Sequence, residues 1–120
     1  MSHSASQAAA FYKDVAKLRK VWGVRDSSGI PAPMTSTGKR SMPFWSTESR
    51  SDQIVKNVHS YNGFEVFSID LDKFMYSWIS GISNDGFMIG VNWSGPNATG
   101  YDVEPSDVFK NIEHQLSKIT

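Results

Sequence analysis

The sequence predicts a single α+β domain with a largely antiparallel sheet of about five to six strands and about four helices, in the order α-βββ-α-β-α-ββ-α. A length of 120 residues suits one domain. Segments with helical periodicity are separated by short apolar runs, and several of these runs are joined by tight turns, which favours antiparallel neighbours. We therefore expect one globular domain over residues 8–118, preceded by a flexible tail at residues 1–7.

Two helices are predicted in the first half of the chain. In residues 4–20, Ser4 and Gln7 have the spacing of a capping box, and an apolar face follows them. Residues 46–58 form the second predicted helix, and either Ser46 or Ser49 is expected to cap it.

Two more helices are predicted in the second half. The helix at residues 71–82 should be capped by Asp70 and end near Gly86, which can adopt a left-handed conformation. Its apolar face is the most regular in the chain: Leu71, Phe74, Met75, Trp78, Ile79 and Ile82. The last helix should begin at Pro105 and bury Val108, Ile112 and Leu116.

The predicted strands fall between these helices. Three short strands are expected near residues 20–25, 30–34 and 40–45, although Pro31 and Pro33 make the middle one irregular or place it at an edge. Residues 64–69 form another predicted strand. Residues 87–93 are apolar almost throughout, which is typical of a strand covered on both faces, and residues 101–103 form its short return strand.

Composition excludes several classes of function. Lys and Arg total 12 and Asp and Glu total 12, so the net charge is zero and we expect no nucleic-acid partner. The absence of cysteine excludes disulfides, thiolate nucleophiles and cysteine-bound metal. No segment approaches the roughly 20 apolar residues of a membrane span, and no signal peptide is recognisable. We expect a soluble, cytoplasmic protein without a membrane partner.

Five motifs follow one another along the chain: Trp22-Gly23, a turn at residues 26–29, Pro43-Phe44-Trp45, the Ile69-Leu71-Phe74-Trp78 pattern, and Asp85-Gly86. Their order and spacing resemble those of a bacterial family known as domain of unknown function 2750. The resemblance covers about residues 8–118. Many relatives have proline after the tryptophan of the third motif, whereas this chain has Ser46. The resemblance implies a fold and carries no activity with it.

The residue types needed for catalysis do not form a recognisable motif. The three histidines, His3, His59 and His114, are far apart in sequence, so we expect neither a metal nor another cofactor. No nucleophile elbow or P-loop pattern is present. Asp70 and Asp72 flank the start of a helix, where capping and the helix dipole explain both carboxylates. We therefore predict no catalytic residue, which favours a protein that is not an enzyme.

One stretch leaves two interpretations open. Trp45 is followed by Ser46 and Thr47 at the predicted start of a helix. Free N–H groups there can hold an anion, and Trp45 and Trp22 could stack on a ring, which makes these four residues candidates for ligand binding. The simpler interpretation places the Trp45 ring in the core and gives the hydroxyl a capping role, and the sequence favours it.

These observations lead to one leading hypothesis and two alternatives. The leading hypothesis is a non-catalytic protein-interaction module, either a homodimer or an immunity-like or regulatory binder of another protein. The first alternative is a small-ligand-binding protein that takes an anionic or aromatic molecule. The second is an enzyme whose active site the sequence does not identify.

Overall fold

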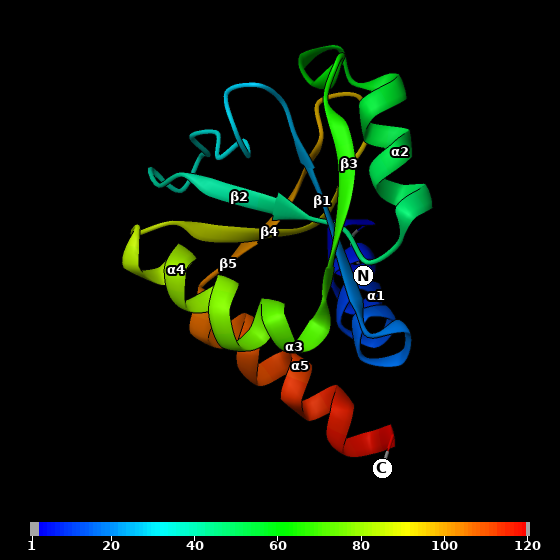
Figure 1. The fold of residues 1–120 in the computed structure, drawn as a ribbon, viewed down its shortest axis with the longest axis vertical. Coiled ribbons are helices and arrows are strands. Elements are labelled where there is room, and N and C mark those ends of the chain that lie inside the picture. The colour runs from blue at the N-terminus through cyan, green and yellow to red at the C-terminus, as the bar shows by residue number, and fades with distance from the viewer. Residues whose placement is uncertain (1–2, 120) are drawn as a thin grey trace.

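A computed structural model describes residues 3–119 (Figure 1). Its elements follow one another as α1 (His3–Leu18), β1 (Lys20–Arg25), β2 (Ser41–Phe44), α2 (Glu48–Asn57), η1 (His59–Tyr61), β3 (Glu65–Asp70), α3 (Leu71–Lys73), η2 (Phe74–Trp78), α4 (Ile79–Asn84), β4 (Met88–Ser94), β5 (Thr99–Val103) and α5 (Pro105–Ile119). Because α3, η2 and α4 are continuous, they form one helix over residues 71–84. The α+β class is confirmed.

The five strands found in the described residues form two small sheets instead of the single larger sheet expected. β1 pairs antiparallel with β3, while β2, β4 and β5 form the second sheet, in which β2 and β4 are parallel and β4 and β5 antiparallel. Trp22 and Trp45 connect the sheets through a pair of backbone hydrogen bonds, each 2.8 Å long. The expected strand at residues 30–34 is irregular, and only its last residue, Met34, makes a bridge, to Arg40.

Two apolar clusters cover opposite sides of this framework. The larger one joins α1, α5 and the helix of residues 71–84 to β2 and β4, and Figure 1 shows α4 and α5 adjacent to each other. The smaller one lies beneath α2, which runs alongside β3, and contains Trp45, Tyr61 and Trp93. Five consecutive residues of β4 are buried, which confirms that this strand is covered on both faces.

The predicted face of the helix at residues 71–84 is also confirmed. Five of its six apolar residues are buried, and Trp78 is half-buried and packs edge-on against Phe44 with ring centroids 6.1 Å apart. Phe74–Trp78 form a π-helical turn. The helix ends at Asp85, after which Gly86 has a φ of 76° and the Phe87 N–H donates to the Ile82 carbonyl at 3.2 Å. That arrangement is a Schellman cap with the expected glycine.

Three expected caps differ from the structure. Thr47, not Ser46 or Ser49, caps α2, and its Oγ1 accepts from the Arg50 N–H at 3.2 Å. Asp70 occupies the N-cap position of α3 but makes no side-chain capping bond, because its carboxylate pairs with Lys20 at 3.2 Å. Ser4 lies inside α1, which already includes His3. Residues 3–7 of the expected tail are therefore helical, and residues 1–2 lie outside the described part of the chain.

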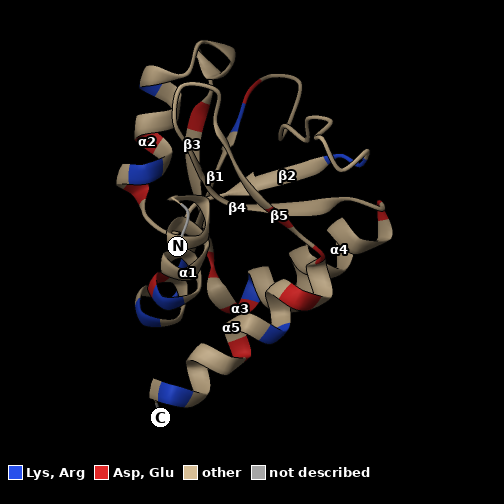
Figure 2. Cartoon of the chain, turned by 180° about the vertical axis from the view of Figure 1, so that it is seen from behind, with Lys and Arg blue, Asp and Glu red and all other residues tan. Residues whose placement is uncertain are grey.

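Charged residues of both signs are interspersed over the chain (Figure 2). Cross-strand ion pairs stand at the two ends of the β1–β3 ladder: Lys20 with Asp70 and Arg25 with Glu65, the latter at 2.8 Å. All four side chains are about half exposed or more, so these pairs specify register more than they add stability. Within residues 3–119, no helix combines the length and hydrophobicity that crossing a bilayer requires.

Candidate functional site

The four residues that the sequence singled out lie close together but mostly inside the protein. Trp45 and Ser46 are both fully buried, and Trp22, which bridges to Trp45, is half-buried. Thr47 caps α2. None of the four lines any of the three clefts described below. The Trp45 indole N–H donates to the Trp93 carbonyl at 2.8 Å, so Trp45 supports Trp93 from within the core.

Ser46 belongs to a buried polar network centred on Asn92. The Asn92 Oδ1 accepts from the Ser46 N–H at 2.9 Å, and its Nδ2 donates to the Ser46 Oγ and the Gln7 carbonyl, both at 3.0 Å. The Ser46 hydroxyl donates to Asp14 at 2.8 Å, and the Gln7 side chain accepts from Arg50. The network joins α1, β4 and the start of α2, and it satisfies the backbone N–H and the hydroxyl of Ser46, two of the groups that the sequence offered to an anion.

Asn92 also produces a β-bulge in β4. Its φ is 50°, a left-handed conformation that asparagine tolerates better than most residues. The pairing with β5 shifts between Val91 and Ser94, so β4 gains one residue relative to its neighbour. As a result, Trp93 leaves the face that Ile89 and Val91 share and lies on the opposite face, over Gly90.

Two glycines make room for the Trp93 indole. A Cβ on Gly90 would lie 2.3 Å from the ring atom Cε2, and a Cβ on Gly100 would lie 3.0 Å from Cδ1. Because both positions lack a side chain, the ring can lie flat across β4 and β5. Its Nε1–H donates to the Tyr101 carbonyl at 3.2 Å, which fixes the orientation of the ring.

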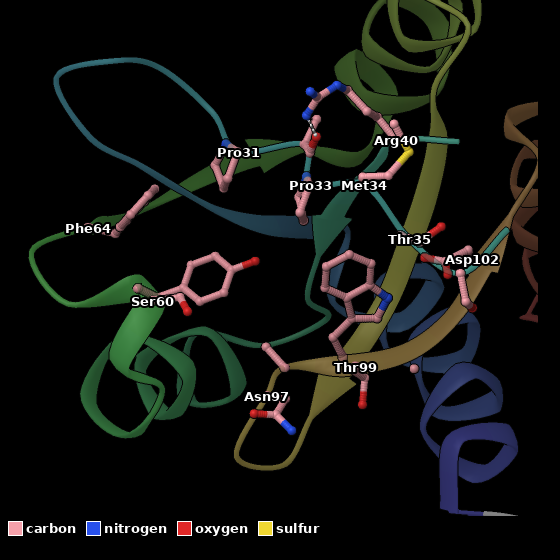
Figure 3. A pocket seen from close by; sticks show the side chains of 16 residues that line it. Pro31, Pro33, Met34, Thr35, Arg40, Ser60, Phe64, Asn97, Thr99 and Asp102 are labelled. Carbon is pink, nitrogen blue, oxygen red and sulfur yellow. Dashed lines mark hydrogen bonds between the residues drawn. The ribbon is translucent and has the colours of Figure 1, made fainter. Parts of the chain in front are cut away.

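Trp93 lines a cleft with a volume of about 600 Å³ (Figure 3). Tyr61 and Phe64, which follow α2, line it together, and their ring centroids are 5.4 Å apart. Pro31 and Pro33, from the irregular segment before β2, also face it. The cleft has the size and the mixture of aromatic and polar groups that are typical of small-molecule sites.

Asp102, on β5, supplies a carboxylate to the cleft. Among residues 3–119, Asp102 Oδ1 and Ser41 Oγ are buried side-chain atoms that make no hydrogen bond. Desolvation raises the pKa of Asp102 above its ordinary value of 3.8, and the nearby Ser41 and Trp93 side chains lower it in part. Ser41 lies close enough to influence the carboxylate, although the two side chains do not reach hydrogen-bonding geometry.

The other ionisable groups of the cleft are Arg40 and Tyr61. The Arg40 guanidinium is exposed and donates from Nη1 to the Ala32 carbonyl at 3.0 Å, a bond drawn in Figure 3. This bond holds the segment that carries the two prolines against the start of β2. Burial raises the pKa of the Tyr61 phenol, so this side chain is neutral and can act as a hydrogen-bond donor over the physiological pH range.

Two smaller clefts each have a volume of about 430 Å³. One lies between α2 and the turn after β4, next to Arg50 and Pro96, and shares Trp93 with the larger cleft. The other lies between α1, β5 and α5, next to Tyr12 and His114. No group of three or more His, Asp or Glu side chains within the described residues could hold a metal ion.

The sequence offered partial signals for the larger cleft. Asn followed by Trp near the end of a strand, together with glycines at positions 90 and 100, could have indicated a bulge and a ring lying on the sheet. Tyr61, Phe64 and Asp102 come from segments that meet only after the chain folds, and none of them belongs to a recognisable motif.

These features define a small α+β protein with a preformed aromatic cleft. The chain belongs to the family described as a protein of unknown function (DUF2750), whose model matches residues 8–112 and confirms the resemblance found in the motifs. Comparison of the chain with curated proteins finds no match.

Proposed function

We propose that this protein is a non-catalytic binding protein that takes a small molecule in the cleft lined by Tyr61, Phe64 and Trp93. The observation that carries the proposal is the construction of that cleft. A bulge, two glycines and an indole hydrogen bond all serve to lay one tryptophan ring flat along it. Trp93 and Tyr61 are 5 % and 7 % exposed, so the same devices bury most of each ring and hold the part that borders the cleft in a fixed position. A ligand needs such a rigid surface, with few polar groups to orient it.

A binding role fits the chemistry of the cleft better than catalysis does. A general base needs a partner that orients it or a neighbouring nucleophile that it can activate. Asp102 has Ser41 beside it, but Ser41 is fully buried and so is not open to a substrate. The sequence placed a possible ligand site at Trp45. The proposal moves that site to Trp93, whose backbone carbonyl accepts a hydrogen bond from Trp45.

A thermal-shift screen of small metabolites, followed by amide NMR titration of each compound that raises the melting temperature, tests this proposal. Thr99→Trp places a bulky ring at an exposed position that lines the cleft. Ser80→Trp, at an exposed helical position outside the three clefts, is the matched control. We expect ligands that stabilise the wild type and Ser80→Trp but not Thr99→Trp. Ligands that stabilise all three proteins equally would show that the site lies elsewhere.

Self-association is the second candidate, and one observation favours it. Within residues 3–119, β5 pairs with β4 alone, so its other edge could pair with a second copy of the strand. Tyr101, on this strand, is 45 % exposed. This candidate is the homodimer form of the interaction module that the sequence favoured.

Analytical ultracentrifugation of the wild type and two variants tests self-association. Tyr101→Lys adds a charge to the edge strand, while Tyr76→Lys changes a tyrosine that is 70 % exposed on a helix. If β5 forms the dimer, only Tyr101→Lys should shift the protein toward monomer. A wild type that is monomeric at about 100 µM, where an interface with a micromolar Kd would be mostly occupied, rules this candidate out.

A further inference from the structure

We infer that the ligand of this cleft is a small organic cation, with an ammonium nitrogen at Asp102 and an apolar or aromatic body against Trp93, Tyr61 and Phe64. This inference rests on the proposed function and adds the chemical class of the ligand.

The Asp102 carboxylate is the group that would bind the ammonium of the ligand. Asp102 Oδ1 is buried out of contact with solvent and makes no hydrogen bond, which leaves this carboxylate poorly compensated; a ligand donor would therefore reach it through its other oxygen. Desolvation opposes the charge of Asp102, and the cation that lies in the same cleft, Arg40, is exposed and bonded to a backbone carbonyl. A ligand ammonium would supply both a positive charge and donors, and a charge-assisted hydrogen bond is about twice as strong as a neutral one.

The aromatic side chains of the cleft also favour a cation. Three of them line one cleft: the Phe64 ring, which is half-buried, and the Trp93 indole and Tyr61 phenol, which are 5 % and 7 % exposed and present a small part of each ring. Ring faces carry negative electrostatic potential and attract a cation within about 6 Å, most strongly when the site is partly desolvated. A carboxylate and several ring faces in one cleft therefore favour a positive ligand over a neutral or negative one.

Arg40 is a positive group in the same cleft, and it could favour an anionic ligand. Its guanidinium has further donors beyond the one that Ala32 accepts, so an anion could in principle bind there. Arg40 is exposed, however, whereas Asp102 is half-buried and has the orphan oxygen. Since an interaction in a partly desolvated place is screened less by water and salt, Asp102 should dominate selection by charge.

A matched series of three probes tests the inference on the full chain. Tyramine carries an ammonium group, tyrosol replaces it with a hydroxyl, and 4-hydroxyphenylacetate carries a carboxylate on a similar ring. Each is titrated into the wild type, Asp102→Asn and Arg40→Gln at neutral pH and low salt. The signals followed are the Trp93 indole N–H resonance and the melting temperature.

We expect tyramine to bind the wild type about tenfold more tightly than tyrosol, the ratio that one charge-assisted hydrogen bond contributes. Asp102→Asn should remove this preference and leave tyrosol binding in place, while Arg40→Gln should keep the preference. Equal binding of tyramine and tyrosol to the wild type would overturn the inference but leave the proposed function standing. Stronger binding of 4-hydroxyphenylacetate, lost in Arg40→Gln, would assign the cleft to anions instead.

Two further outcomes separate the inference from the proposed function. If none of the three probes shifts the Trp93 indole resonance at millimolar concentration, the inference fails for aromatic amines of this size, while the metabolite screen still decides the proposed function. If Asp102→Asn does not fold, the three probes on the wild type alone still decide the sign of the charge. A tyramine preference that survives in a folded Asp102→Asn protein would overturn the assignment of the ammonium to this carboxylate.

Discussion

The Trp93 indole lies over Gly90 so closely that a Cβ on that glycine would lie 2.3 Å from the ring atom Cε2. Gly90→Ala must therefore move the ring or the backbone of β4. Because Trp93 is packed among Val24, Tyr61 and Ala98, we expect a loss of about 1–3 kcal/mol in the free energy of unfolding, the usual cost of overpacking. Urea unfolding followed by circular dichroism measures it.

Gly81→Ala is the control for this substitution. Gly81 lies in α4 at an ordinary helical φ, and a Cβ there would meet no atom within 4 Å. Replacing glycine by alanine in a helix stabilises it by roughly 0.5–1 kcal/mol, so this variant should unfold at higher urea than the wild type. Equal effects of the two substitutions would contradict the packing of Trp93 on Gly90.

Gly90 also shows why the sequence predicted the strand but not the cleft. The apolar run of residues 87–93 was enough to predict a strand covered on both faces, because that pattern depends only on burial. The bulge at Asn92 reverses the direction of the following side chain, and a period-two pattern read through it assigns Trp93 to the wrong face. The side chains that complete the cleft, Tyr61 and Asp102, meet Trp93 only through tertiary contacts.

The cap of α2 was misplaced for a different reason. Ser46, Thr47 and Ser49 are all good N-caps by residue type, so local propensity does not separate them. Tertiary structure decides, because the Ser46 hydroxyl donates to Asp14 and is unavailable to the helix. The Thr47 hydroxyl, which is the next one along the chain, caps the helix.

The position of this cap can be tested by removing each hydroxyl in turn. Thr47→Ala should cost about 1 kcal/mol in the free energy of unfolding, because the Arg50 N–H loses its partner. Ser49→Ala, at an exposed position inside α2, should change it by less than about 0.5 kcal/mol. Chemical denaturation of both variants makes the comparison, and a larger loss for Ser49→Ala would restore the cap expected from the sequence.

Asp102 should make the free energy of unfolding depend on pH in a direction that can be predicted. Its folded-state pKa is raised above 3.8 by desolvation, so folding favours the protonated acid. The resulting stabilisation is fully present below the ordinary pKa and is lost as pH rises through the folded-state value. Asp102→Asn keeps a neutral group at every pH. We therefore expect the stability of Asp102→Asn minus that of the wild type to increase from about pH 4 to pH 7.

Urea unfolding of both proteins at intervals across this range measures the difference. Ser41→Ala is the companion variant, because the Ser41 side chain is one of the groups that lower the pKa of Asp102. Its removal should raise that pKa further and move the pH-dependent window upward. A stability difference between Asp102→Asn and the wild type that stays flat, or falls as pH rises, would show that burial does not raise the pKa of this carboxyl.

The network centred on Asn92 gives the last prediction. Asn92→Asp keeps the shape of the side chain but replaces the Nδ2 donor with an oxygen that faces the Gln7 carbonyl and the Ser46 Oγ. Two hydrogen bonds are lost and a charge is introduced where the native side chain is 1 % exposed, near Asp14, which bonds the same serine. We expect a loss of more than about 3 kcal/mol at neutral pH that diminishes in acid, where the new carboxyl is protonated.

Asn92→Gly retains the left-handed backbone and adds no charge, so its loss should be smaller and nearly independent of pH relative to the wild type. Urea unfolding at pH 5 and pH 7.5 distinguishes the two variants. If Asn92→Asp unfolds within about 1 kcal/mol of the wild type at both values, Asn92 does not make the three bonds that join α1, β4 and α2.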